Sequence, residues 1–483
     1  MNNSPLSRLA ARILGLALAA TAAGCVDQAK EVALYRKQLD AMPGVATTPV
    51  PTEEAPLTLQ AALQLAEKND ESLGLSGETY VQALIAKDRE FATLLPQINL
   101  GPTLSESQPA RGAPGPIHNF TIPLNASLNA FNLQDYAAID EDSATAEQNR
   151  QLLLNEQQTI LFDVVQDYYA VLQNERSVEV YQSSLAEQEE LVRQAKAKYN
   201  LGNGTPLAIA QSQSQASSTR VQLIQAEASV VTARAMLAFL VGSPVTTRPL
   251  VDGFVTPADE LQPVEGWIAE ADIHRQDLAA ADAGVLAARQ GVRAAMSEYM
   301  PSVTVNLQYL IYKETQPLNN KLSGGISANI PIFTGGQIEA DVRSAFSVLR
   351  SALLTQSQTR KQVEDDIRTA YANLQSSRDQ IRELRVELSA NRDALVLAQR
   401  EEPLGLAITL DVLTAQAALL STQLSLATQE YQEKINYLDL LRVSGRLTLA
   451  DATPTTHPST EPADLIEITT PNEISTPTTA PAQ

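Results

Sequence analysis

The chain has 483 residues, of which 5% are aromatic, and it contains a single Trp. Ala, Gln, Ser and Leu dominate, a mixture that suits long helices packed closely through small residues and argues against an ordinary globular core. With 35 Lys and Arg against 56 Asp and Glu, the formal net charge is -21; such an acidic surface repels phosphate backbones and excludes nucleic acid as a partner.

Residues 1–24 have the pattern of an export signal. Arg8 and Arg12 provide a basic start, and no acidic residue precedes Asp27. Residues 13–23 then form an apolar run that is too short to span a bilayer. We therefore predict a signal peptide that is removed on export.

Cys25 is the only cysteine, so no intrachain disulfide is possible. The preceding small residues resemble the bacterial lipoprotein signal, in which the Cys is acylated after cleavage, although Ala22 stands where that signal prefers Leu. We expect lipidation at Cys25 and a lipidated linker over residues 25–56; an ordinary secretory signal with an incidental Cys is the alternative. Val26 rather than Asp follows the Cys, which favours the outer membrane.

After the linker the chain is built twice, over residues 57–255 and 256–450. Residues 169–176 (YAVLQNER) and 371–378 (YANLQSSR) share Tyr, Ala, Leu, Gln and Arg in register. Further matches follow in the same order, at offsets between 202 and 205: 95–96 with 300–301, 201–202 with 404–405, and Gln213 with Gln416. Several matches at a near-constant offset indicate an internal repeat.

Each repeat is predicted to contain two strands, a very long helix, a break and a returning helix. In the first repeat these are about 95–106, 117–132, 134–199 and 206–241; in the second they are about 301–313, 322–333, 336–402 and 409–445. Each long helix would extend about 100 Å. Apolar residues recur along both at helical spacing, in a narrow stripe that favours coiled-coil packing: Ile160, Val164, Tyr168, Leu172, Val178, Tyr181, Leu185 and Val192, then Val363, Ile367, Tyr371, Leu374 and Ile381.

The strand segments alternate apolar and polar residues, most clearly over 303–309 and 122–130. Alternation gives one apolar face and one polar face, and the polar face here is mostly Asn, Ser, Thr and Gln, as in a barrel lumen. A soluble sandwich shows the same pattern, but the sequence offers no partner sheet. Four strands cannot close a barrel and open edges are forbidden in lipid, so a membrane location requires oligomers: two copies supply eight strands and three supply twelve.

These residues resemble the TolC/OprM outer membrane efflux family over almost the whole chain after the linker. The resemblance rests on the duplication, on Pro96 and Pro301 between helix and strand, on residues 333–337 (FTGGQ), and most of all on residues 404–416 (LGLAITLDVLTAQ). It implies an α+β membrane protein: a homotrimeric 12-stranded β-barrel, four strands per chain, continuous with a periplasmic α-helical coiled-coil tunnel.

The resemblance also implies a function. The duct would be passive, and its hairpin tips would dock a periplasmic adaptor that connects to an inner-membrane pump, in a tripartite efflux or type I secretion system. The docking tips would be Leu201, Gly202, Gly204, Thr205, Leu404 and Gly405, although all of these also serve as ordinary helix-stop residues. Asp411 falls on the family's constriction aspartate, where three copies would form a carboxylate ring as the periplasmic gate. Thr414 stands where a second acidic ring is common, and a helix-start carboxylate is the simpler interpretation of Asp411.

No catalytic constellation is found, and neither a metal nor a cofactor is expected. The three histidines are far apart, and no Gly-rich segment has the spacing of a phosphate loop. Two other classes remain possible: a non-pore periplasmic coiled-coil adaptor or scaffold lipoprotein, and a lipoprotein enzyme. Trp267 is predicted to be a core residue, and the Thr/Pro-rich tail, 451–483, is predicted to be disordered.

Overall fold

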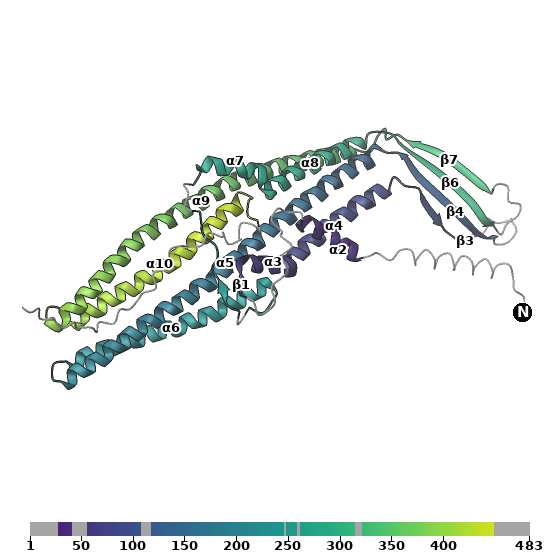
Figure 1. Cartoon of the computed structure of the whole chain (residues 1–483). Coiled ribbons are helices and arrows are strands. Elements are labelled where there is room, and N and C mark those ends of the chain that lie inside the picture. The colour runs from purple at the N-terminus through teal and green to yellow at the C-terminus, as the bar shows by residue number, and fades with distance from the viewer. Residues whose placement is uncertain are drawn as a thin grey trace, which may run out of the picture.

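The computed structural model describes residues 28–40, 56–107, 117–245, 248–257, 261–313 and 321–448. The predicted signal peptide, Cys25, most of the linker and the 451–483 tail lie outside these residues. Figure 1 shows an elongated molecule with a β-sheet at one end, two helical hairpins at the other, and shorter helices around its middle.

Two long helices form the body of the molecule. The linker contains α2 (Gln28–Asp40). The first repeat contains β1 (Leu57–Thr58), α3 (Leu59–Asn69), α4 (Glu71–Ala92), β2 (Gln97–Leu100), β3 (Thr103–Ser107), β4 (Ile117–Phe131), α5 (Leu133–Asn200), α6 (Pro206–Val241) and β5 (Leu250–Val251). The second contains α7 (Val264–His274), α8 (Gln276–Ser297), β6 (Ser302–Lys313), β7 (Leu322–Asn329), α9 (Gln337–Glu401), a short 3₁₀-helix (Glu402–Leu404) and α10 (Thr409–Val443). The long helices α5 and α9 have 68 and 65 residues.

The helices lie side by side in a fixed order. In the half nearer the sheet, α4 packs on α5, α5 on α8, and α8 on α9. In the half nearer the tips, α6 packs on α5, α5 on α10, and α10 on α9 (Figure 1). α9 therefore ends the row on one side in both halves, and α4 and α6 end it on the other.

The sheet has the order β2-β4-β6-β7, with β3 also paired to β4. The strand predicted at 95–106 is thus interrupted, because Pro102 has no N–H to donate to a ladder; Gly101 still donates to the carbonyl of Pro123 at 3.3 Å. The last strand ends at Asn329, short of the predicted 333, and Pro331 follows. The sheet is four strands wide, and within the described residues no further strand pairs with its outer edges.

The register separates an apolar from a polar face. Leu100, Leu124, Tyr309 and Leu322 lie opposite one another across the four strands. The adjoining row is polar: Asn99, Asn125, Gln308 and Ser323. Within it, Gln308 donates from Nε2 to Oδ1 of Asn125 at 3.0 Å. The alternation read from the sequence is therefore realised on the paired strands.

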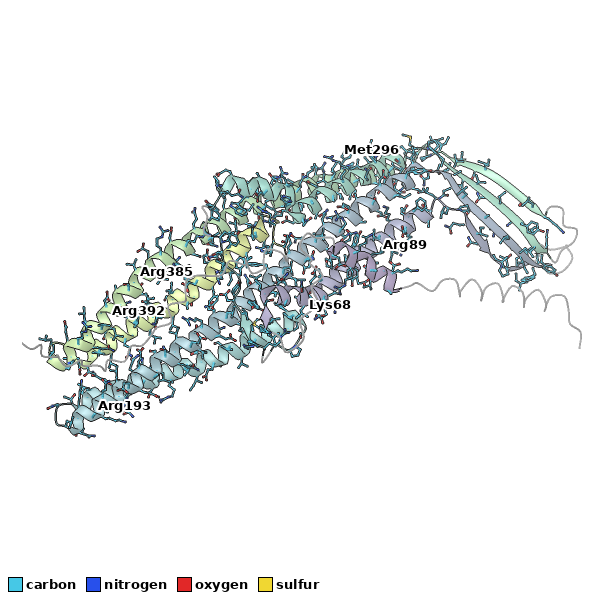
Figure 2. The ribbon with its side chains drawn as sticks, in the orientation of Figure 1. Lys68, Arg89, Arg193, Met296, Arg385 and Arg392 are labelled. Atoms are coloured by element: carbon cyan, nitrogen blue, oxygen red, sulfur yellow. The ribbon has the colours of Figure 1, made fainter. Side chains whose placement is uncertain are left out.

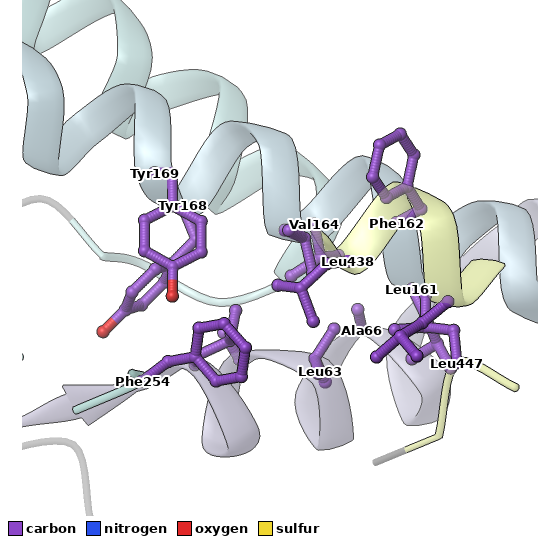
Figure 3. Packing of buried hydrophobic residues seen from close by; sticks show 14 of the residues in the cluster. Leu63, Ala66, Leu161, Phe162, Val164, Tyr168, Tyr169, Phe254, Leu438 and Leu447 are labelled. Carbon is purple, nitrogen blue, oxygen red and sulfur yellow. The ribbon is translucent and has the colours of Figure 1, made fainter. Parts of the chain in front are cut away.

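The main core lies in the middle of the molecule, where α3 and α7 and the carboxyl ends of α6 and α10 pack around α5 and α9 (Figure 3). Tyr168 is fully buried, and its hydroxyl lies 2.8 Å from the carbonyl oxygens of both Leu57 and Val251, which share its one proton, and accepts from the Val251 N–H. That hydroxyl holds the parallel pair β1–β5, which sequence analysis did not predict. Trp267 is 6% exposed, which confirms it as a core residue.

The apolar stripe of α5 does not continue at full depth to its end. Ile160, Val164, Tyr168 and Leu172 are buried as expected, whereas Tyr181, Leu185 and Val192 are only partly buried. In the lower half the most buried residues of α5 are small or polar: Ser184, Gln188 and Ala195. Close helix–helix approach through small side chains replaces large apolar knobs there.

Candidate functional site at the helical hairpin tips

The first tip connects α5 to α6 and depends on two glycines. Gly202 has φ +80°, a conformation that glycine adopts without a steric cost, and its N–H donates to the Tyr199 carbonyl at 2.9 Å. A Cβ on Gly204 would lie 2.6 Å from the backbone nitrogen of Tyr199, so this close approach requires glycine. Thr205 then caps α6, accepting from the Ala208 N–H at 3.2 Å through its hydroxyl oxygen.

The second tip connects α9 to α10 and is built differently. The chain passes through the 3₁₀-helix, and Gly405 (φ +72°) donates to the Glu402 carbonyl at 3.1 Å. Ile408 occupies the N-cap position of α10, where it has no hydroxyl to offer. The Asp411 carboxylate takes part of that role by accepting from the Ile408 N–H at 2.9 Å. The second helix start is therefore capped from inside the helix.

Asp411 is solvent-exposed in the single chain and lies in the first turn of α10. A carboxylate there is stabilised by the helix dipole and by the capping hydrogen bond. This geometry accounts for an Asp at that position in one chain, and it leaves the second carboxylate oxygen available to solvent or to a pore. Thr414, one turn later, donates back to the Leu410 carbonyl at 2.8 Å.

Polar contacts join the two tips across the gap between the hairpins. Lys198 of α5 forms an ion pair with Glu402, whose other carboxylate oxygen accepts from the Thr409 hydroxyl at 3.4 Å. Further from the tips, Gln416 of α10 donates from Nε2 to Glu187 of α5 at 3.1 Å. None of these residues except Gln416 was singled out from the sequence, because a contact between repeats leaves no local pattern.

Large apolar side chains are exposed on both tips. Leu201 is 79% exposed and Leu404 is 72% exposed. The neighbouring Leu207, Leu406 and Ile408, which sequence analysis did not assign to docking, are similarly exposed. Charged groups flank them, and Arg193 lies close to the first tip in Figure 2. An exposed apolar cluster with a polar rim is typical of a protein-binding surface.

Two further predictions, on the lipid anchor and on metal binding, concern residues away from the tips. Cys25 lies outside the described residues. Among the residues that the structure describes, no group of three or more His, Cys, Asp or Glu side chains is placed to hold a metal ion.

Comparisons with known proteins agree with this architecture. The sequence model of a family described as outer membrane efflux protein matches residues 62–243 and 267–446, one segment in each repeat. Outer membrane efflux protein BepC of Brucella suis is 29% identical over 68% of this chain and 72% of its own length. Outer membrane protein TolC of Escherichia coli is 22% identical over 74% of this chain and 76% of its own. The crystal structure of the Campylobacter jejuni CmeC outer membrane channel superposes with a TM-score of 0.72 at 16% identity, covering 84% of this chain and 91% of that one.

Proposed function

This chain belongs to the outer membrane efflux protein family, and on that premise we propose that it is a passive exit duct in the outer membrane. It would serve a tripartite efflux or type I secretion system, together with a periplasmic adaptor and an inner-membrane pump. The family's members are channel proteins, and an adaptor or scaffold without a pore is not favoured, because the family match spans both repeats.

The observation that carries the proposal is the sheet with one apolar face, one polar face and two free edges. Its longest strands, β4 and β6, have 15 and 12 residues, enough to cross a bilayer when tilted. Because unpaired backbone groups cannot face lipid, β2 and β3 of one copy must pair with β7 of another. Three copies of a four-stranded sheet then give the twelve-stranded barrel.

The order of the helices also supports closure of several copies into a ring, as the edges of the sheet do. Since α9 ends the row of helices on one side and α6 on the other, closing the ring brings α6 of one copy beside α9 of the next. α6 carries an exposed apolar stripe at spacings of three or four residues: Val221, Ile224, Ala228, Val231, Ala235 and Phe239. Within the described residues, α6 is also the one helix long and apolar enough to cross a membrane by length and composition alone. We assign this stripe to a seam between subunits, because its spacing is that of coiled-coil packing.

A planar bilayer tests the duct. Purified full-length protein should insert as a trimer and give discrete single-channel currents that persist without any energy source. A protein that folds and remains trimeric but never conducts would overturn the duct and favour a scaffold.

The proposed docking surface for the adaptor is the pair of tips, which includes Leu201, Gly202, Gly204 and Thr205 in one hairpin and Leu404 and Gly405 in the other. The exposed leucines supply the apolar contact, and the glycines fix the turns that present them. Replacing Leu201 and Leu404 with Asp should abolish adaptor capture on a biosensor while leaving conductance intact. Conductance serves as the control for folding.

Asp411 is proposed as the periplasmic gate, where three carboxylates would converge, attract cations and resist closure by mutual repulsion. Asp411→Asn keeps an oxygen that can accept from the Ile408 N–H but removes the charge, whereas Asp411→Ala removes both. If the carboxylates form the gate, both variants lose block by a trivalent cation in single-channel recordings. If Asp411 only starts the helix, the Asn variant is blocked as strongly as the parent.

Cys25 is proposed to carry acyl chains that attach the amino terminus to the outer membrane. Two or more chains give firm attachment, but a trimeric barrel provides far more buried apolar surface. The Cys25→Ser protein should therefore still insert and conduct. Intact-protein mass spectrometry checks the anchor directly, and an unmodified, uncleaved Cys25 would contradict it.

A further inference from the structure

α2 begins three residues after Cys25 and is held on α4 and α5 by its own side chains. Tyr35 and Leu39 are buried in a cluster with apolar side chains of both helices. The Tyr35 ring lies so close to Gly77 of α4 that a Cβ there would be 2.5 Å from Tyr35 Cδ2. The body of the molecule therefore fixes the place from which the chain leads to the proposed lipid anchor.

Contacts at the other end of α2 show which way this helix runs. Arg36 donates to the carbonyls of Glu67 at 3.0 Å and Lys68 at 3.1 Å, at the end of α3 and just before α4 begins. Burial raises the pKa of Glu67, and the charge of Asp40, the last residue of α2, raises it further. The start of α4 is its end far from the sheet (Figure 1). α2 therefore runs opposite to α4, and its first residue is the one nearest the sheet.

Chain lengths then limit how far the anchor can reach toward the sheet. Gln28 precedes Tyr35 by seven residues, about 10 Å of helix. The three residues from Cys25 to Gln28 can add at most about 10 Å. Along α4, Phe91 follows Gly77 by 14 residues, about 21 Å. Cys25 can therefore reach the level of Phe91, at the end of α4, and not much further.

Phe91 lies on the same face of α4 as α2. Fourteen residues are close to four whole helical turns, so Phe91 is only about 40° around α4 from Gly77. Leu84, which packs on the cluster around Tyr35, lies between them on this face. Phe91 is nevertheless 53% exposed, because α2 begins further from the sheet. A large aromatic side chain thus stands uncovered at the point to which the anchor can reach.

The same level is marked at all four points where a helix meets the main sheet. Large apolar side chains are exposed at each of these points, although the four belong to different parts of the sequence. We call them the collar: Phe91, Leu95, Phe131, Leu133, Tyr136, Met296, Tyr299, Met300, Ile330, Ile332 and Phe333. Figure 2 shows Met296 at the end of α8 that meets the sheet. Aromatic and apolar side chains in such a band are typical of the boundary between lipid and water.

We propose that the collar and the acylated amino terminus form one surface that binds the periplasmic leaflet of the outer membrane, with α2 as the spacer that sets the height of the anchor. The proposal rests on the lipid anchor proposed above and adds the position of the membrane on the molecule. The sheet agrees with this position, since β6 has 12 residues and a tilted strand needs about 9–11 to cross the hydrocarbon.

The test uses full-length acylated protein in vesicles of phosphatidylethanolamine and phosphatidylglycerol, with a bimane fluorophore on one introduced cysteine. Acylation occupies the Cys25 thiol, so Phe91→Cys, Ala29→Cys and Lys37→Cys each have a single free thiol. The probe is a lipid with a nitroxide on its headgroup, which quenches only nearby fluorophores. Quenching should be strong at position 91, weaker at 29 and absent at 37, because Lys37 lies about 12 Å further from the sheet than Ala29.

Two outcomes of this experiment would overturn the proposal. Equal quenching at positions 29 and 37 would mean that α2 lies flat on the membrane surface and is no spacer. Absence of quenching at position 91 would place the membrane away from the collar.

A pair of substitutions in α2 tests whether its contacts hold it in place. Leu39→Asp puts a charge on a side chain that is 1% exposed and should release α2, so that positions 29 and 37 are quenched alike. Leu34→Asp adds the same charge on a side chain that is 44% exposed and should preserve the difference. Quenching at position 91 should be unchanged in both and serves as the control for insertion. A difference preserved in both variants would contradict the role of the buried contacts.

Cys25→Ser, produced behind a cleavable signal peptide, separates the spacer from the anchor on which it rests. Contacts with α4 and α5 hold α2, so the difference between positions 29 and 37 should persist without acyl chains. A difference that disappears would show that the membrane positions α2, which overturns the spacer. Mass spectrometry of the parent protein tests the anchor separately, and an unmodified Cys25 overturns the anchor whatever the quenching shows.

Discussion

Single glycines permit several close contacts in this chain, and a Cβ on Gly77 would make the shortest of them. It lies in α4 beneath the ring of Tyr35 from α2, and a Cβ on Gly77 would lie 2.5 Å from Tyr35 Cδ2. Tyr35 and Leu39 are buried with Leu73, Val81 and Leu153 in a second core cluster. The helix closest to the proposed lipid anchor is thus held against the body of the molecule through a glycine.

Gly77→Ala should therefore displace the Tyr35 ring and loosen α2. Overpacking of this kind costs about 1–3 kcal/mol, against a gain of about 0.5–1 kcal/mol from helix propensity. We expect a lower melting temperature and faster proteolysis within residues 28–40.

Gly74→Ala is the matched control, one turn earlier in the same helix. Nothing lies within 4 Å of a Cβ at this position. The propensity term then acts alone, and the melting temperature should rise or stay unchanged. Equal effects of the two substitutions would show that the packing of the Tyr35 ring does not require a glycine at position 77.

At the scale of elements, the two returning helices begin in different ways although they come from one duplicated unit. α6 has Pro206 in its first turn and a hydroxyl cap from Thr205, whereas α10 begins after Ile408 and depends on Asp411. Each tip has a glycine with positive φ, Gly202 or Gly405, and the two tips differ in the 3₁₀-helix before the second turn and in the cap of the returning helix. The start of α10 is the less firmly capped of the two.

Removal of the cap of α6 and addition of a hydroxyl cap to α10 should change the stability of the two first turns in opposite directions. Thr205→Ala removes the acceptor of the Ala208 N–H and should destabilise the first turn of α6 by about 1 kcal/mol. Ile408→Thr adds a hydroxyl at the corresponding position and should stabilise the first turn of α10. Hydrogen exchange of the amides in each first turn measures both effects, and no change in either turn would contradict the capping assignment.

The two returning helices, α6 and α10, also end in a similar way. The carbonyl of Val241 at the end of α6 accepts from Asn69 Nδ2 at 3.0 Å. The carbonyl of Val443 at the end of α10 accepts from Arg275 Nη1 at 3.2 Å. Both donors lie at the junction between the two short helices of their repeat, so different residue types perform the same role.

Over the whole molecule, carboxylates gather where the helices meet the sheet. Burial raises the pKa of Glu90, Asp135, Glu141 and Glu298 above the usual values. Neighbouring carboxylates raise it further for three of them, including Asp142 beside Glu141 and Asp341 beside Glu298. Deprotonation of these groups opposes the folded state.

The sign of the resulting pH dependence follows from the raised pKa values. The stabilising contribution is complete below the pKa of the unfolded chain, about 4, and is lost as pH rises through the folded pKa. We therefore expect the melting temperature to increase as pH is lowered from neutral through the folded pKa values toward about 4. The double variant Glu90→Gln, Glu298→Gln should show a shallower slope; a parent protein that is most stable at the alkaline end would contradict the assignment.

The seam between subunits provides a prediction at the same scale. Val231→Glu places a charge in the middle of the α6 stripe, where burial against α9 of the next copy would cost several kcal/mol. Native mass spectrometry should show loss of trimer. Gln222→Glu adds the same charge at an exposed position outside the stripe and should leave the trimer intact. A stable trimer in the Val231 variant would place the seam on another face.

Much of this molecule can be read from the sequence, because its main features are local. The repeat follows from matching residues such as Tyr169 and Tyr371, the long helices from their periodicity, and the strands from alternation. The tips follow from Gly202 and Gly405, whose positive φ angles the structure places at the turns. Each of these signals extends over a few residues of one segment, so no knowledge of packing is needed.

Only the tertiary structure decided which segments meet. The hydroxyl of Tyr168 holds β1 and β5, which lie far apart in the chain, and Lys198 reaches Glu402 across the two repeats. Gln416 is buried although its counterpart Gln213 is exposed. Equivalent positions in a duplicated sequence have the same local pattern, but the fold places different neighbours around them, and the neighbours determine burial, charge balance and binding.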